Sequence, residues 1–314
     1  LHSNFKKCLS SGGSLQMKVF PFIKIENKKY PTVIMGEDHF TGWFKKCKKY
    51  NSEKERGKEY QETLETAYSL GVRGFSMSPH STLIKVLKDF KQKHPGIVCI
   101  SNHHWHTNYY LGNKSLWLGK NLERVGASEA FDYDKDLIKD SDWFKNADVK
   151  KRFSKKEINS FRLDEEEYKQ QLDKFSFCDF SLVGNLGRSA LINLGREDIV
   201  KREIELVKEK GLVPIGMCEG GGLALTKYEK MNVAGTWIWI NKHEACPNLD
   251  YTLKIIKKSK KPITAYRVFA SPDGFNLEKS ISFIKSIKKI KSVVVGVNGK
   301  EQAKETFSGL REYW

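Results

Sequence analysis

The chain has 314 residues, of which 39% are hydrophobic, 30% charged and 12% aromatic. Such a chain can bury one large core or two small ones, which excludes a disulfide-stapled miniprotein, a coiled coil and a disordered tail. No apolar run reaches the roughly 18 residues that span a bilayer, and the start carries no apolar stretch of a secretory signal. We therefore expect a soluble, cytoplasmic protein with no membrane partner.

Lysine and arginine outnumber aspartate and glutamate by 55 to 38, which gives a net charge of +17. The excess is spread over lysine-rich helical stretches such as 255–261 and 284–291, as is typical of a solvated surface. Nucleic-acid binding would require the charge on one face with interleaved aromatic residues, so nucleic acid is not an expected partner. The charge instead suits a small-molecule substrate that is anionic or phosphorylated, and the sequence leaves the oligomeric state open.

The first predicted element begins only near residue 31. We expect residues 1–16 to be a cloning remnant or a disordered segment, because a natural-looking start, MKVFPFIKI, begins at Met17. From there on, short β-branched runs alternate with amphipathic helical patterns. The eight predicted strands are Thr32–Gly36, Val72–Met77, Ile97–Ser101, Phe180–Gly184, Val213–Met217, Gly235–Ile240, Ile263–Val268 and Ser292–Val297, and the clearest helices are Lys58–Leu70, Thr82–Lys93, Glu197–Lys210, Leu277–Ile290 and Lys300–Leu310.

Eight strand–helix units in a chain of this size predict an α/β fold, a closed (β/α)8 or TIM barrel. An open doubly wound sheet is the alternative, but no GxGxxG pattern follows the first strand. We expect residues 17–314 to form this single domain, with 107–174 inserted between the third and fourth strands as a helical segment that caps one barrel face. The aromatic residues of the insertion indicate local packing, with a substrate lid as the alternative.

Catalytic groups of such a barrel lie at the carboxyl ends of its strands. Six of the eight histidines directly follow a predicted strand, and carboxylates accompany them. Imidazole and carboxylate groups act together as general acid and base, or as ligands of a divalent metal that activates water; the alternative is that the histidines only cap strand ends. The predicted catalytic residues are Asp38, His39, His80, His104, Glu219 and Arg267, of which His80 and Arg267 orient the substrate, and the predicted metal ligands are Asp38, His39, His104, His106 and Glu219.

Two glycine-rich turns are candidate anion sites. In GMCEGGG, Gly220–Gly222 let the backbone approach a ligand closely and leave amides free for an anion, with a plain flexible loop as the alternative. After the last strand, VVVGVNGKEQAKE places a glycine turn and a helix start where barrels commonly hold a phosphate group. The predicted cofactor-binding residues of this second turn are Gly296, Asn298, Gly299 and Lys300.

Three stretches of the chain resemble the aldo-keto reductase superfamily. KREIELVKEKGLVPIGMCEG resembles the family's helix and strand that end in "IGvS", and KSKKPITAYRVFASPDGF resembles its "g.pviamkplagG" segment. IKKIKSVVVGVNGKEQAKET resembles its closing "p.v.svvvGm.s.eq..e", and the strands GVRGFSMS and FCDFSLVG extend the likeness over most of the chain from Pro31 onward. The resemblance implies a (β/α)8 barrel and NADPH-dependent carbonyl reduction by an Asp, Tyr, Lys and His quartet.

The sequence departs from this quartet at every member. Where the family's second strand reads "iDtA..Y", the chain has FSMS followed by His80 and Ser81; Ser101 or Asn102 stands in place of the lysine; and "l.lvH" appears as SLVG. The closing strand also lacks the arginine-rich phosphate clamp of NADP-binding members. We interpret the chain as a related barrel whose redox residues have been replaced by a histidine and carboxylate site.

Three functional hypotheses follow. The first is a non-redox enzyme, a hydrolase, lyase or isomerase of a small polar or anionic substrate, with zinc, iron or manganese as the expected cofactor rather than NADP. The second is an NAD(P)H-dependent oxidoreductase in which His80 or His39 replaces the tyrosine as proton donor; Tyr109 and Tyr110 are further candidates. The third is a catalytically inactive binding or scaffold barrel.

Overall fold

A closed barrel of eight parallel strands forms the centre of the molecule. The computed structural model describes residues 18–42, 47–103, 108–117, 120–132, 144, 147–184, 186, 189–269 and 276–314. The strand order around the barrel is β10-β11-β12-β13-β3-β4-β5-β9. The bounds are β3 (Val33–Gly36), β4 (Gly74–Met77), β5 (Val98–Ser101), β9 (Phe180–Val183), β10 (Val213–Cys218), β11 (Gly235–Trp239), β12 (Ile263–Tyr266) and β13 (Ile290–Gly296). The predicted (β/α)8 barrel is therefore confirmed, and each predicted strand coincides with an observed one to within two residues at either end.

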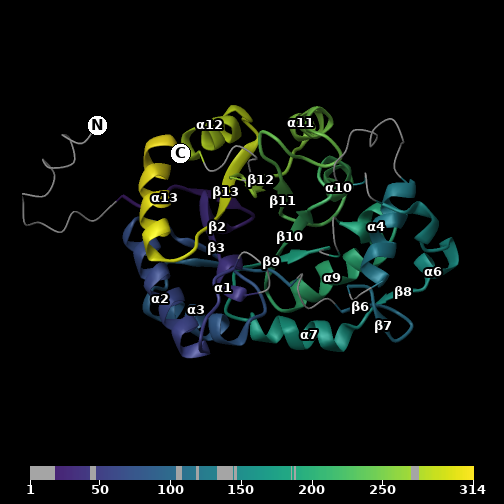
Figure 1. The fold of residues 1–314 in the computed structure, drawn as a ribbon, viewed down its shortest axis with the longest axis horizontal. Coiled ribbons are helices and arrows are strands. Elements are labelled where there is room, and N and C mark those ends of the chain that lie inside the picture. Colours follow the sequence, from purple (N-terminus) through teal and green to yellow (C-terminus); the bar gives the residue numbers. More distant parts are fainter. Residues whose placement is uncertain are drawn as a thin grey trace, which may run out of the picture.

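Helices surround this barrel, and α13 packs against α2 and α12 (Figure 1). The helix α2 begins five residues before its predicted start because the Ser52 hydroxyl accepts a hydrogen bond from the Glu55 amide. The helix α12 ends four residues early because β13 already begins at Ile290. The bounds are α1 (Asp38–Thr41), α2 (Glu53–Ser69), α3 (Ser81–Lys93), α8 (Ala190–Asn193), α9 (Glu197–Glu209), α10 (Gly222–Tyr228), α11 (Leu249–Lys258), α12 (Leu277–Ser286) and α13 (Lys300–Tyr313).

A hairpin that the sequence reading did not predict closes the amino end of the barrel. Its strands are β1 (Phe22–Ile25) and β2 (Lys28–Pro31), which pair in an antiparallel register. Tyr30 is fully buried and packs edge-on against Phe180 inside the barrel. Its hydroxyl is 3.0 Å from the Thr264 hydroxyl and accepts a hydrogen bond from Trp237 Nε1 at 2.7 Å. The hairpin therefore plugs the barrel and has a polar anchor on β11 and β12.

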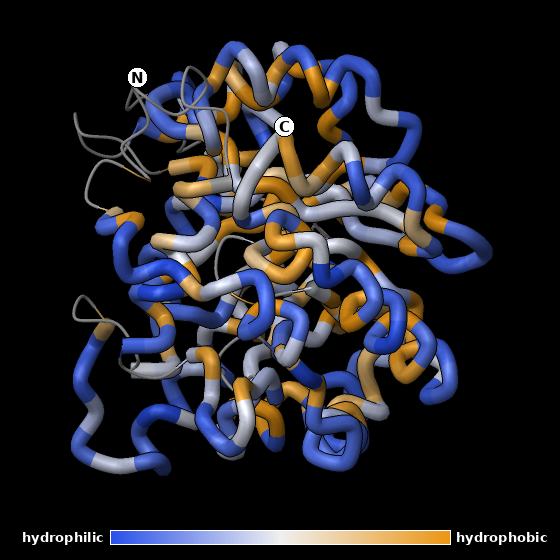
Figure 2. The backbone as a smooth tube through the Cα atoms, turned by 90° about the vertical axis from the view of Figure 1, so that its right-hand side faces the viewer, coloured by the Kyte–Doolittle hydropathy of each residue, from blue (hydrophilic) through white to orange (hydrophobic). Residues whose placement is uncertain are grey.

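Two layers of apolar residues stabilise the fold. Alternate strand residues, such as Ile215 and Met217 of β10, fill the barrel interior together with the hairpin, while the intervening residues pack against the helices. Figure 2 shows the result, with hydrophobic segments gathered toward the middle and hydrophilic ones on the outside. Among the described residues, no helix is long and apolar enough to cross a bilayer.

Most of the chain between β5 and β9 lies beside the barrel, to the right in Figure 1, whereas its last helix, α7, runs along the bottom of the barrel and its buried Tyr168 and Leu172 belong to the main apolar core. This part of the chain contains a small antiparallel sheet in the order β7-β6-β8 and several helices. The bounds are β6 (Tyr109–Leu111), β7 (Lys114–Ser115), α4 (Lys120–Asp132), η2 (Val149–Lys151), α6 (Lys155–Asn159), β8 (Phe161–Leu163) and α7 (Glu165–Lys174).

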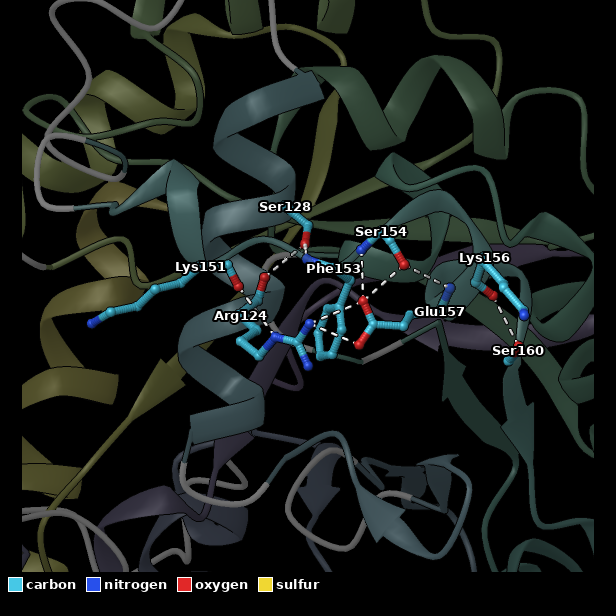
Figure 3. A network of polar contacts seen from close by, with 8 residues as sticks. All are labelled: Arg124, Ser128, Lys151, Phe153, Ser154, Lys156, Glu157 and Ser160. Atoms are coloured by element: carbon cyan, nitrogen blue, oxygen red, sulfur yellow. Dashed lines mark hydrogen bonds and ion pairs between the residues drawn. The ribbon is translucent and has the colours of Figure 1, made fainter.

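The insertion has a polar network of its own (Figure 3). Arg124 on α4 donates two hydrogen bonds to the Glu157 carboxylate of α6, at 2.8 and 3.0 Å, and its guanidinium lies 3.8 Å from the centre of the buried Phe153 ring. Glu157 also accepts a bond from the Ser154 amide, which completes a capping box at the start of α6. These contacts show local packing of Phe153; Tyr133 and Trp143, two other aromatic residues of the insertion, lie outside the described residues.

Candidate functional site

Three of the predicted catalytic residues meet at the carboxyl end of the barrel. Asp38 begins α1 directly after β3, Glu219 follows β10, and Arg267 follows β12. Burial is the main cause that raises the pKa of Asp38 to about 7; the charges of Glu37 and Glu219 raise it further and that of Arg267 lowers it. The barrel therefore brings together three side chains whose positions in the sequence are widely separated.

Arg267, at the carboxyl end of the barrel, combines an unusual backbone conformation with a side chain stacked on an aromatic ring. Its φ of 55° lies in the left-handed region that non-glycine residues seldom adopt, and its carbonyl accepts a hydrogen bond from Asn241 Nδ2 at 3.3 Å. Its guanidinium lies 3.8 Å from the centre of the Trp239 ring, and the residue is exposed. This arrangement holds a solvent-accessible cation at the rim, where an anionic group of a substrate could pair with it.

Tyr266 belongs to the same cluster, although the sequence reading did not select it. Its hydroxyl oxygen is buried and has no hydrogen-bond partner among the described residues. Burial raises the pKa of Tyr266 well above its usual range, with the charge of Glu219 as the next cause. The signal was available, since Tyr266 is the last residue of β12 and alternates with the outward-facing Ala265, but the prediction selected only Arg267 from the predicted strand 263–268.

Glu37 is a second residue that the prediction passed over. It is 1% exposed, and its two carboxylate oxygens accept hydrogen bonds from the hydroxyls of Ser76 and Ser78 on and after β4. Ser76 stands where the family motif would have its aspartate. The chain thus has a carboxylate near this position, but it belongs to Glu37 after the neighbouring strand β3 and is hydrogen-bonded by the serines on and directly after β4.

The described histidines do not form one cluster. The His39 ring lies against Gly296 of β13, and burial lowers its pKa. His80 is the N-cap residue of α3, and its Nε2 lies 3.8 Å from Glu53 Oε2 on α2. His103, also located after β5, is a core residue whose Nε2 is 2.9 Å from the Ser181 hydroxyl, and burial lowers its pKa to about 3. His104 and His106 lie outside the described residues.

The predicted metal ligands that can be placed are Asp38, His39 and Glu219. Within the described ranges, no group of three or more histidine, cysteine, aspartate or glutamate side chains is arranged to hold a metal ion. Asp38 and Glu219 are electrostatically coupled, whereas His39 packs on Gly296. The described donors by themselves therefore do not form a metal site, and the predicted ligands His104 and His106 lie outside the described residues.

The predicted phosphate turn after β13 is bonded within the protein. The Asn298 amide donates to Gln302 Oε1 at 2.6 Å, and Lys300 forms a 3.3 Å ion pair with Glu62 of α2. The Glu59 carboxylate lies beside Gly299, whose φ is 96°. Protein acceptors and carboxylates thus lie close to Gly299, Asn298 and Lys300, and the cofactor role of this turn stays a prediction.

The glycine amides of GMCEGGG are hydrogen-bonded within the protein and are not free to bind an anion. The amides of Gly220, Gly221 and Gly222 donate to Ser189 Oγ, Cys218 O and Cys246 O, at 3.3, 3.1 and 3.0 Å. A side chain at Gly221 would collide with the Cys246 carbonyl. The expectation of free amides here is wrong, because the close approach that requires glycine is made by another part of the backbone.

The two alternative tyrosine donors are bonded to carboxylates outside the cluster of Asp38, Glu219 and Arg267. Tyr109 donates a hydrogen bond to Glu203 of α9, and Tyr110 donates one to Glu167 at 2.8 Å. Glu203 is fully buried and also accepts a bond from the Gly184 amide at 2.6 Å, and burial raises its pKa to about 7. This carboxyl joins the insertion to α9 and to the end of β9.

Comparisons with known proteins agree on the architecture. No protein-family model matches the chain, and no curated protein matches it. Two structures described as candidate aldo-keto reductases of Pseudomonas aeruginosa match with TM-scores of 0.55 and 0.54, at 12% and 11% identity; they cover 94% and 96% of this chain and 96% and 100% of their own. An aldo-keto reductase of Bacillus halodurans, solved in a holo form, matches with a TM-score of 0.55 at 10% identity over 93% of this chain and 91% of its own.

Such low identities establish the fold and nothing finer. The chain has a (β/α)8 barrel similar to that of aldo-keto reductases, so the resemblance found in the sequence is confirmed at the level of the fold. The activity has to be argued from the side chains at the mouth.

Proposed function

We propose that the protein is an enzyme that performs acid–base chemistry on a small polar or anionic substrate at the carboxyl end of its barrel. The observation that carries this proposal is the electrostatic coupling of Asp38, Glu219, Tyr266 and Arg267, contributed by three different strand ends. Hydrolysis, elimination and isomerisation are the reaction types that such groups support without a redox cofactor.

Asp38 is the proposed proton carrier. A group with a pKa of about 7 is present in both protonation states near neutral pH, which is the condition for efficient general acid and base catalysis. Glu219 supplies the second carboxylate, and its charge favours the protonated form of Asp38. Asp38 would therefore donate a proton to a leaving group or accept one from the substrate.

Arg267 is the proposed substrate-binding residue. Its charge lowers the pKa of Asp38, so an anionic substrate that pairs with Arg267 would reduce this influence and strengthen the hold of Asp38 on its proton. Binding of the anionic substrate would thus raise the pKa of Asp38 and increase the fraction of Asp38 that carries a proton.

The test is a screen of phosphomonoesters, hydroxy acids, sugar phosphates and lactones with wild-type protein, followed by Asp38→Asn on any substrate that turns over. Asp89→Asn is the matched control, because Asp89 is an exposed carboxyl on the outer helix α3. Loss of turnover in Asp38→Asn alone supports the proposal. Equal turnover in both variants, or a ¹³C carboxyl resonance of Asp38 that titrates near pH 4, would overturn it.

A second candidate function is an oxidoreductase in which Tyr266 is the proton donor. The buried Tyr266 hydroxyl, coupled to Asp38 and Arg267, is the observation that favours it, together with a fold similar to that of aldo-keto reductases. Titration with NADPH, followed by fluorescence, separates the two functions. Saturable binding that supports carbonyl reduction would favour the oxidoreductase, and an absence of binding at millimolar NADPH would exclude it.

A further inference from the structure

Lysines gather at the amino end of the barrel, opposite the candidate site. The segments 257–262 and 285–291, which lead into β12 and β13, contain eight lysines and no acidic residue. The hairpin segment 18–32 adds four lysines against one glutamate, and 91–97 adds two more without an acid. Because the helices of a barrel run opposite to its parallel strands, all these segments lie at the same end.

Helix capping explains only part of this charge. Lysines in the last turn of a helix, such as Lys257, Lys258 and Lys285, complement the partial negative charge of the helix end. Beyond the helix ends, however, the loops and the hairpin carry further exposed lysines that have no such role. We call these the lysine face: Lys24, Lys29, Lys260, Lys288, Lys289 and Lys291.

Other cations at this end are engaged in the fold. Lys261 donates to the carbonyls of Met231 and Val233, at 2.8 and 2.6 Å. Arg73 donates to Tyr68 O and Val72 O, and Arg311 donates to Lys18 O and Leu70 O. The exposed charge is therefore carried by lysines, which act as hydrated point charges and lack the planar fork of arginine.

We propose that the lysine face binds the surface of an anionic lipid bilayer. The hairpin, the connections before the neighbouring strands β12 and β13 and the start of β13 carry these six lysines on one end of the barrel. Point charges on several separate loops match a plane of lipid phosphates and carboxylates better than they match the narrow track of a nucleic acid. Nucleic-acid sites also use arginine forks or exposed aromatic platforms. At this end, Arg73 and Arg311 donate hydrogen bonds to backbone carbonyls. The large hydrophobic residue that is exposed among the described residues of this end is Val19, which is not aromatic.

This orientation has a functional consequence. A protein that rests on a bilayer by its amino end presents the mouth with Asp38, Glu219 and Arg267 to the aqueous side. The proposal differs from the expectation of no membrane partner, which treated the charge as spread over the surface because the lysine stretches are separate in the sequence. It does not depend on the proposed chemistry at the mouth.

The test is sedimentation with vesicles of phosphatidylcholine that contain 0 or 30 mol% phosphatidylserine, at low and at physiological salt. We expect binding only to the anionic vesicles, weakened by salt. In the variant Lys260→Gln, Lys288→Gln, Lys289→Gln, Lys291→Gln, partitioning should fall by about tenfold or more, since each lysine contributes to attraction by the surface.

The matched control removes four exposed lysines from the helix layer: Lys54→Gln, Lys85→Gln, Lys88→Gln and Lys304→Gln. It has the same net charge as the face variant and should keep partitioning within about twofold of wild type, and circular dichroism checks that both variants fold. Equal losses in both variants, an absence of binding to anionic vesicles, or binding of a duplex RNA or DNA probe in place of vesicles would overturn the proposal.

Discussion

The two ends of the barrel differ in the kinds of side chain that their loops carry and in how deeply these side chains are buried. At the carboxyl end, strand ends bring Asp38, Glu219, Tyr266 and Arg267 into one coupled cluster, with buried or half-buried acids and a strained arginine backbone. At the amino end, a hairpin with a buried Tyr30 plugs the barrel, and exposed lysines cover the outside. The carboxyl whose pKa is raised by its charged neighbours and the strained arginine backbone therefore lie at one end, while the other end provides closure and surface charge.

The largest expected effect is the loss of turnover in Asp38→Asn, and an unchanged turnover would break this comparison. Removal of the proton carrier should lower kcat by about 100-fold or more on the substrate found by screening, because general acid or base catalysis contributes on that scale. Steady-state kinetics at pH 7 measures it, with thermal unfolding to show that the fold persists. A kcat within threefold of wild type would mean that the acidic end is not catalytic.

Arg267→Ala should raise KM for an anionic substrate by about tenfold to 100-fold with a smaller change in kcat, because it removes a charge-assisted contact. The variant also removes the cation stacked on Trp239. A neutral analogue of the same substrate is the control, and its KM should change little. Equal effects on both substrates would show that Arg267 supports the loop instead of binding the anion.

Glu203→Gln should change how stability depends on pH. The folded-state pKa of Glu203 is raised from 4.5 to about 7, so the folded protein holds this proton more tightly than the unfolded chain does. The resulting stability is fully present below about pH 4.5 and is lost as pH rises through about 7. Urea unfolding at pH 5.5 and 8.5 should show a loss of roughly 1–3 kcal/mol in wild type that shrinks in the variant. Identical pH dependence in both proteins would contradict the assignment.

Tyr30→Phe tests whether the amino end of the barrel contributes to stability and not to turnover. The variant leaves Trp237 Nε1 without its acceptor and removes the contact with Thr264, so the free energy of unfolding should fall by about 1–2 kcal/mol. Turnover should stay within twofold of wild type, since this end holds structure. Chemical unfolding and kinetics on one preparation check both statements, and a large loss of kcat with unchanged stability would reverse the roles of the ends.

The smallest expected effect belongs to Lys300→Ala at the turn after β13. Lys300 is exposed and pairs with Glu62. We expect kcat, KM and any affinity for NADPH to remain within about twofold of wild type, because exposed ion pairs contribute little. A tenfold loss of NADPH affinity would instead support the predicted cofactor role of Gly296, Asn298, Gly299 and Lys300.

Local patterns in the sequence were sufficient for the barrel itself. Strand runs such as 213–217 and helix patterns such as 197–210 are short-range signals, and Gly71 and Gly211, which follow α2 and α9, have left-handed φ values of 89° and 74°. The hairpin was missed because its FIKI and KKYP runs are short and polar on one side. Its role depends on Tyr30 reaching Trp237 and Thr264, which are more than 200 residues away.

The candidate site was only partly predictable. The prediction selected Asp38 and Glu219 after two strands and Arg267 inside the predicted strand 263–268, and the barrel brings these three residues to one end. The described histidines do not form one cluster: His39 and His80 lie at separate places, His103 is a core residue, and His104 and His106 lie outside the described residues. Whether a polar group faces the mouth, a helix or another strand depends on packing partners from distant segments, which a linear pattern does not contain.

The sequence alone therefore determined the strand and helix periodicity, the (β/α)8 architecture and the total charge, because each is a local or summed property of residues. The tertiary structure decided which side chains meet. It raised the pKa of Asp38 by burying it beside Glu37 and Glu219, occupied the glycine amides with protein acceptors, and placed the lysine-rich connections before β12 and β13 at the same end of the barrel as the hairpin. These properties arise from burial and from distances across the fold, and both exist only once the barrel has closed.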